Sequence, residues 1–229
     1  MSNRRNRVAV LVPSSNTVME NDLHQALSKD RYTVHAGRMY LVETTRGAEI
    51  EMIEHFARPA AKDLATTKPD LLVFGCTSAG SLYGHEYDRN LCSELGEIVG
   101  CPVVSVIDAA SRALEAVSAR RLAVITPYNE DLTASVARAL ETGTRRVVAA
   151  HGMGITVNVE LADPTPSEIA AFAVEKLRNV QFDTLFVSCT NFRAIEAKSR
   201  LEMQFGRNVV TSNSSVVDAI ESTFRRIAR

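Results

Sequence analysis

Two cysteines in this chain stand where thiols can do chemistry. Cys76 follows the apolar run 71–74, Cys189 follows the mostly apolar run 182–187, and a threonine comes after each cysteine. Both runs have the character of buried strands, and open α/β sheets bind ligands just outside the carboxyl ends of their strands. A thiolate there can add to an electron-poor carbon or remove a proton beside a carbonyl, and a second thiol can return that proton. The two Cys-Thr corners therefore predict a catalytic pair, Cys76 and Cys189.

Neutral hydrogen-bond donors surround both corners in the sequence. Hydroxyl and amide groups suit carboxylate oxygens and can stabilise negative charge that develops on a substrate. A predicted helix start at residues 14–17 would add backbone N–H groups to an anion-binding corner. The candidate donors are Ser14, Ser15, Asn16, Thr17, Thr77, Ser78, Thr190 and Asn191. The predicted ligand is a small carboxylate.

Two further residues are candidates because of their positions. Tyr128 follows Pro127 as Ser14 follows Pro13, which favours a hydroxyl facing the substrate over a plain helix-start aromatic. Asn158 lies in the segment 154–158, where the residues alone support a turn and a binding role equally.

The chain contains an internal duplication. Residues 7–13 (RVAVLVP) are echoed by residues 121–127 (RLAVITP), and nearly the same spacing separates Pro13 from Cys76 and Pro127 from Cys189. Strand patterns alternate with helical patterns, as in parallel βαβ units. We therefore expect an α/β fold of two pseudo-symmetric, doubly wound parallel-sheet halves. Such halves would place both cysteines in the cleft between them, with the active site there.

The duplication also sets the expected boundaries. Residues 1–118 form a first half with Cys76, and residues 119–207 form a second half with Cys189. Residues 208–229 form a closing strand and helix. The sequence leaves open which half this helix packs on, and the first half is one choice. We expect strands at 8–12, 32–41, 71–74, 102–106 and 121–126, helices at 18–27, 50–64, 90–99, 108–117 and 214–227, and loops at 43–47 and 80–84.

Composition argues against several classes of protein. The 229 residues have a formal net charge of −1 and are 45% hydrophobic, which is ordinary for a globular chain. The basic residues are scattered, so no nucleic-acid partner is expected. No apolar run is long enough to span a bilayer, and the start lacks the pattern of a signal peptide, so we expect no membrane partner and a cytoplasmic location.

In the cytoplasm the four cysteines are expected to be reduced thiols. Cys92 falls inside a helical pattern and Cys101 precedes a strand pattern, so both are assigned to the core, where free cysteine often serves as a small hydrophobe. No Cys-x-x-Cys motif or paired histidine spacing is present, and we expect neither a metal nor a cofactor. Assembly into a homo-oligomer is left open.

A family resemblance rests on the Cys-Thr corners and on residues 12–20, VPSSNTVME. Over essentially its whole length the chain resembles the aspartate/glutamate racemase superfamily, and residues 12–20 resemble the N-terminal signature of the maleate cis-trans isomerases. The resemblance implies cofactor-independent conversion of maleate to fumarate through a covalent adduct of Cys76. It also implies that Cys189 donates and accepts the proton and that Asn16, Tyr128 and Asn158 hold the substrate carboxylates.

Several alternatives remain beside this interpretation. Arylmalonate decarboxylases carry a glycine at the position of Cys76, so the paired thiols count against them, whereas an ectoine-catabolism branch shares much of the signature. An amino-acid or hydantoin racemase would use two opposed cysteines, but amino-acid racemases must recognise an ammonium group. The first corner holds no carboxylate, since Glu20 and Asp22 lie beyond it. A two-lobed small-molecule sensor would explain the duplication but needs no pair of thiols.

Overall fold

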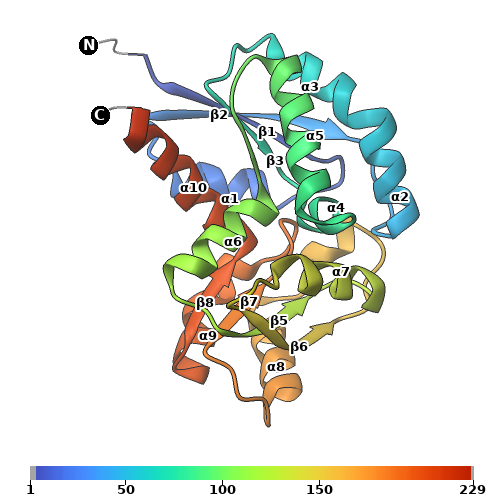
Figure 1. Ribbon diagram of the computed structural model, residues 1–229, viewed down its shortest axis with the longest axis vertical. Helices are drawn as coiled ribbons and strands as arrows, with labels where there is room; N and C mark the ends of the chain where they lie inside the picture. Colours follow the sequence, from blue (N-terminus) through green and yellow to red (C-terminus); the bar gives the residue numbers. More distant parts are fainter. Residues whose placement is uncertain (1–3, 228–229) are drawn as a thin grey trace.

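The computed structural model describes residues 4–227, so the extreme ends of the predicted segments, residues 1–3 and 228–229, lie outside the described residues. Within the described residues, two parallel sheets of four strands each are built from the two halves of the chain (Figure 1). The first sheet contains β1 (Asn6–Pro13), β2 (Tyr32–Met39), β3 (Leu71–Phe74) and β4 (Val103–Ser105), and the second contains β5 (Arg121–Thr126), β6 (Arg146–Gly152), β7 (Thr184–Val187) and β8 (Asn208–Thr211). The predicted α/β fold of two parallel-sheet halves is confirmed.

The strand orders of the two sheets repeat the duplication. The first sheet runs β2-β1-β3-β4 and the second runs β6-β5-β7-β8, so corresponding strands occupy corresponding places. Side-chain contacts repeat as well: Asp70 accepts the Arg7 backbone N–H at 2.8 Å, and Asp183 accepts the Arg121 backbone N–H at 2.8 Å. β3 and β7 are both inner strands, and each ends at a Cys-Thr corner.

Helices connect the strands in both halves. They are α1 (Met19–Ala26), α2 (Arg46–Glu51), η1 (Met52–Ala57), α3 (Arg58–Ala65), α4 (Thr77–Ser81), α5 (Gly84–Val99), α6 (Val106–Ala116), α7 (Glu130–Leu140), η2 (Val159–Ala162), α8 (Pro166–Leu177), α9 (Ala194–Phe205) and α10 (Ser212–Ile227).

The expected loop at 80–84 is wrong. Residues 77–81 form the helix α4, and α5 begins at Gly84 instead of near Asn90. Every residue of α4 is buried, so tertiary packing outweighs the weak helix preference of its serine and glycine residues. A side chain at Gly80 would come within 2.9 Å of Asp88 Oδ1, which shows how closely α4 and α5 pack.

The helix expected over 50–64 begins earlier, and the loop expected at 43–47 is correspondingly shorter. α2 begins at Arg46, where the Thr45 side chain accepts the Ala48 N–H, and the helical path continues through the π-helical turn η1 into α3. Pro59 lies at the start of α3 and has no N–H to donate to the preceding turn. A wide π turn just before a proline accommodates that missing bond within one continuous helical path.

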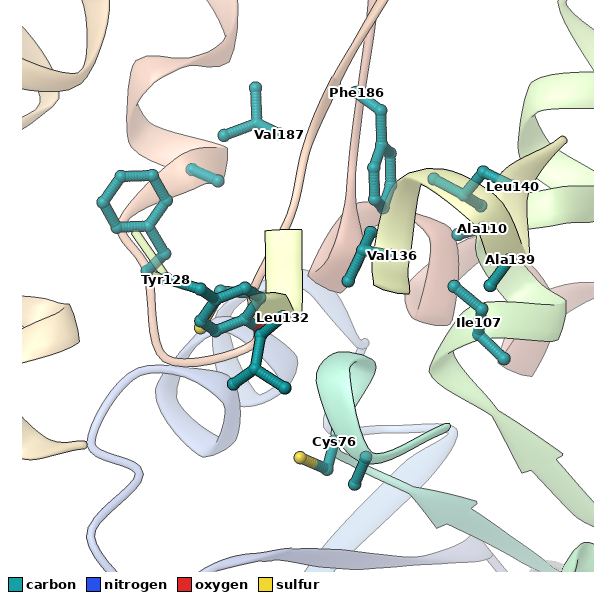
Figure 2. Packing of buried hydrophobic residues seen from close by; sticks show 14 of the residues in the cluster. Cys76, Ile107, Ala110, Tyr128, Leu132, Val136, Ala139, Leu140, Phe186 and Val187 are labelled. Atoms are coloured by element: carbon teal, nitrogen blue, oxygen red, sulfur yellow. The ribbon is translucent and has the colours of Figure 1, made fainter. Parts of the chain in front are cut away.

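One core joins the two halves. Side chains alternate along β1, so Ala9 and Leu11 face one hydrophobic cluster and Val8 and Val10 face another. The first cluster also contains residues of the second half, such as Phe186, so the halves are not packed separately. Ile107 and Ala110 of α6 lie beside Val136 and Ala139 of α7 in this shared core (Figure 2).

The C-terminal segment divides between the halves. β8 pairs with β7 in the second sheet, whereas α10 packs on the first half. Its Val216 and Ile220 lie in the cluster formed by the α1-facing side of the first sheet, and the rings of Phe224 and Tyr32 are 5.7 Å apart. The final helix therefore packs on the first half. The sequence had left open which half it packs on.

Shortening a buried side chain of α10 should destabilise the whole protein. Ile220 is fully buried, so Ile220→Ala should lower the free energy of unfolding by about 2–5 kcal/mol, measured by urea denaturation. The matched control is Met203→Ala, because Met203 is 80% exposed and should change stability by less than about 0.5 kcal/mol. Equal effects of the two substitutions would contradict the packing of α10 on the first half.

Candidate active site

Cys76 lies at the corner between β3 and α4. Cys76 is the N-cap residue of α4. Its side chain is buried, and its Sγ lies 3.7 Å from Ser78 Oγ. Burial, followed by the nearby Glu49 carboxylate, raises the pKa of this thiol well above its ordinary value, while the Ala79 N–H and the Ser78 hydroxyl oppose that rise. Gly75 lets the chain reach this corner, because a Cβ there would lie 2.9 Å from the Leu11 carbonyl oxygen.

Cys189 lies at the matching corner after β7. Its backbone has a φ of 102°, an unfavourable region for a residue with a side chain, and the Ser212 hydroxyl accepts its N–H at 3.0 Å. The Asn191 N–H points at Cys189 Sγ from 3.2 Å. Burial raises the pKa of the Cys189 thiol to about 12, against hydrogen bonds from the Tyr128 hydroxyl and the Asn191 amide.

Tyr128 brings a hydroxyl to Cys189 and lies in the electrostatic range of Cys76. It is 2% exposed and belongs to the same core cluster as Cys76 and Leu132 (Figure 2). Its hydroxyl is hydrogen bonded to Cys189, and burial together with the two nearby thiols raises the pKa of Tyr128 well above its ordinary value. The structure thus places together the two cysteines and the tyrosine that the sequence singled out.

The first polar corner is already engaged in protein contacts. The hydroxyls of Ser14 and Ser15 both donate to the Leu41 carbonyl oxygen, at 3.3 and 2.7 Å. Asn16 accepts two N–H groups at the start of α1 with its Oδ1 and donates from Nδ2 to Thr190 Oγ1 at 3.0 Å. Asn16 therefore joins the corners of the two halves directly.

Asn158 and Asn191 extend this connection. Asn158 Nδ2 donates to Ser15 Oγ at 2.7 Å, Thr44 Oγ1 donates to Asn158 Oδ1 at 2.8 Å, and Asn191 Nδ2 donates to the Asn158 carbonyl oxygen at 2.6 Å. Asn158 lies in the turn before η2, and its buried side chain contacts other candidate residues, so its binding role stays a prediction.

Two loops hold each other across this corner. The Thr44 N–H donates to the Thr156 carbonyl oxygen at 2.6 Å, and the Asn158 N–H donates to the Val42 carbonyl oxygen at 2.8 Å. Glu43 and Val157 form an antiparallel bridge between them. We name residues 42–44 and 156–158 the clasp. With the clasp closed, both thiols are buried, so the site is closed to solvent.

The threonines that follow the cysteines connect the two corners. Thr77 Oγ1 lies 3.0 Å from Ser212 Oγ, and Thr190 Oγ1 donates to the Gly75 carbonyl oxygen at 3.0 Å. Because Ser212 also accepts the Cys189 N–H, its one hydroxyl touches both corners. Sequence reasoning missed Ser212, since it assigned the start of the last helix to residue 214.

Glu49 is the second residue that sequence reasoning missed. It is fully buried on α2 and accepts a hydrogen bond from the Ser78 hydroxyl. Burial raises the pKa of this carboxyl group to about 8, although the bond from Ser78 and the charge of Arg46 oppose the rise. The available signal was its spacing: Glu49 precedes the buried Ile53 by four residues and so continues the apolar stripe of the helix.

Other features of the described residues bear on cofactors and location. Residues 4–227 contain no group of three or more histidine, cysteine, aspartate or glutamate side chains placed to hold a metal ion. Over the same range no helix combines the length and the apolar character needed to cross a bilayer. Cys92 and Cys101 are free and half-buried, and both pack against the core, as expected.

Comparison with protein families matches residues 8–224 to the arylmalonate decarboxylase family. The chain belongs to this family. A relative, the maleate isomerase of Pseudomonas putida, is 27% identical over 218 residues, which cover 90% of this chain and 86% of the relative. The family thus carries the name of one activity while a relative carries the name of another, so membership identifies an enzyme family and not a single reaction.

Crystal structures of maleate isomerases share the fold of this family member. A cysteine-to-alanine mutant of the maleate isomerase of Pseudomonas putida S16, described with maleate, has a TM-score of 0.89 at 23% identity, covering 97% of this chain and 93% of that chain. A mutant of the Nocardia farcinica maleate cis-trans isomerase, described with a covalently bound succinylcysteine intermediate, has a TM-score of 0.87 at 19% identity, covering 97% and 94%. The predicted resemblance to this group of the aspartate/glutamate racemase superfamily is confirmed.

Removing the Tyr128 hydroxyl should make Cys189 less reactive. Tyr128→Phe deletes a hydrogen bond that favours the thiolate, so alkylation of Cys189 by iodoacetamide should slow by about tenfold at a fixed pH, followed by peptide mass spectrometry. Cys101 in the same sample is the reference thiol. An unchanged ratio of the Cys189 rate to the Cys101 rate would contradict the bond.

Proposed function

We propose that this protein converts maleate to fumarate without a cofactor, through a covalent adduct of Cys76. The observation that carries the proposal is a pair of buried thiols at matching corners, both close enough to the Tyr128 hydroxyl to raise its pKa. The maleate isomerase relative and the succinylcysteine described for the Nocardia farcinica enzyme support the same chemistry.

In the proposed reaction the Cys76 thiolate attacks one alkene carbon of maleate. A C–S bond forms, and the π electrons move onto the neighbouring carboxylate to give an enediolate. The C2–C3 bond is then single and rotates. The electrons return to form the trans alkene as the C–S bond breaks, and Cys189 supplies or removes a proton where the adduct passes through its succinyl form.

The neutral donors would hold the two carboxylates during this rotation. In the proposed complex, carboxylate oxygens replace the protein partners of Asn16, Tyr128 and Asn158. The remaining candidates supply further hydrogen bonds around the substrate: Ser14, Ser15, Thr77, Ser78, Thr190 and Asn191. Opening of the clasp would admit the substrate, because both thiols are buried when the clasp is closed.

The other sequence-based expectations belong to the same proposal. The enzyme would work in the cytoplasm on a small dicarboxylate, where its free cysteines stay reduced. Its halves would keep the expected boundaries, 1–118 and 119–207, with 208–229 shared between them.

Glu49 favours a second candidate, an amino-acid racemase. The sequence argued against a racemase because no carboxylate stands at the first corner, but Glu49 reaches Ser78 from α2. Its Oε2 is buried and has no hydrogen-bond partner among the described residues. An ammonium group would provide such a partner, and the two cysteines would then act as opposed bases.

Proton NMR in deuterated water separates the two candidates. Reduced protein incubated with maleate, without added metal, should produce fumarate, and Cys76→Ala should lower the rate by about 10³-fold or more because the nucleophile is lost. A racemase would instead replace the α-proton of an amino acid with deuterium. Inert maleate together with such exchange would overturn the isomerase proposal.

Mass spectrometry of the intact protein tests the covalent step. Cys189→Ala keeps the nucleophile but removes the partner thiol, so an adduct of maleate on Cys76 should accumulate and turnover should slow. The matched controls are Cys92→Ser and Cys101→Ser, which lie away from the paired corners and should leave turnover unchanged. Full turnover by Cys189→Ala would argue against a two-thiol mechanism.

A further inference from the structure

A buried chain of hydrogen-bonding groups leads away from Cys76. Cys76 Sγ lies 3.7 Å from Ser78 Oγ, and the Ser78 hydroxyl donates to Glu49 Oε1. We propose that Glu49 accepts, through Ser78, the proton that Cys76 loses when it becomes a nucleophile. The proposal rests on the attacking role of Cys76 proposed above, and it adds Glu49 as a proton acceptor acting through Ser78.

Glu49 occupies a position that is unfavourable for a charged group. It is fully buried, and an isolated buried carboxylate is costly unless it is paired. Arg46, whose charge lowers the pKa of Glu49, instead contacts Asp131, Ser135 and the Leu82 carbonyl oxygen. A buried carboxyl group that is bonded to Ser78, beside a reactive thiol, is typical of a group that takes part in the chemistry of a site.

The proton transfer conserves charge. As the Cys76 S–H bond breaks, its proton passes to Ser78 Oγ, and Ser78 gives its own hydroxyl proton to Glu49 Oε1. The products are a Cys76 thiolate, a neutral Ser78 and a neutral Glu49 carboxylic acid. One negative charge thus moves from Glu49 to the sulfur, and Glu49 and Cys76 are never charged at the same time.

The electrostatic surroundings make Glu49 a suitable acceptor. It is faced by Arg46 on its own helix and Asp131 on α7, by the thiols of Cys76 and Cys189 at the two corners, and by the Tyr128 hydroxyl. Because burial raises the pKa of Glu49 to about 8, its basicity comes closer to that of a thiolate than an exposed carboxylate's does. Cys76 and Glu49 therefore titrate as a coupled pair that shares one proton.

The pH dependence of Cys76 alkylation by iodoacetamide tests the proposal. The pair must lose one proton before the reactive form exists, so the rate for the unmodified protein should rise with pH and level off above about pH 8. In Glu49→Gln the thiol must ionise alone, so the rate at pH 8 should fall by about 10²-fold and keep rising at higher pH. Glutamine retains an oxygen that can accept the Ser78 bond.

Ser78→Ala provides the second variant, because it breaks the connection and leaves Glu49 in place. It should slow Cys76 alkylation and remove the levelling-off in the same way. Cys189 in the same samples reports access: a closed site would slow both thiols, whereas a lost relay slows Cys76 alone. Circular dichroism and thermal melting confirm folding of each variant.

Three results would overturn the proposal. Faster alkylation of Cys76 in Glu49→Gln would mean that Glu49 only repels the thiolate. An unchanged pH profile in Glu49→Gln would remove Glu49 from the reaction, and an unchanged profile in Ser78→Ala would remove the relay. Since the readout is alkylation and not turnover, a protein inert to maleate that still shows the predicted profiles would refute the isomerase proposal and leave the relay in place.

Discussion

The structure depends on burying the carboxyl ends of two parallel sheets against each other. Strand ends leave polar backbone groups and side chains without strand partners, and away from water each such group needs a partner inside the protein. The two corners provide those partners for each other, through Asn16 with Thr190, Thr190 with the Gly75 carbonyl oxygen, and Ser212 with Thr77. The polar residues proposed to bind substrate are therefore also the residues that join the halves.

The same burial determines the resting state of the reactive groups. A charged group loses the stabilisation of water when it is buried, so burial is the largest influence on Cys76, Cys189, Glu49 and Tyr128, and it raises all four pKa values. Near neutral pH both thiols then rest in their uncharged form. Thiol chemistry in such a site requires a nearby base, and Glu49 is placed to provide it once it has lost its own proton, near pH 8.

The sequence predicted those parts of the molecule that repeat or that end a strand. Duplication and apolar runs identified the two sheets and both thiol corners, and the fold confirms the two halves. The helix α4 could not be predicted, because its serine and glycine residues favour a loop locally and only burial makes them helical. Helical spacing could have marked Glu49 as buried, but its contact with Ser78 and that of Ser212 with Cys189 join separate elements, which the sequence does not place together.

The placement of α10 links global packing to the geometry of the site. Ser212 is the first residue of α10 and touches both Cys-Thr corners, while Phe224 near the other end of the same helix packs against Tyr32 of the first sheet. β8, just before Ser212, belongs to the second sheet. A helix that starts in one half and packs on the other therefore fixes the distance between the corners. Because Ser212 accepts the N–H of Cys189, whose backbone φ is unfavourable, the packing of this helix contributes to the position of the second thiol.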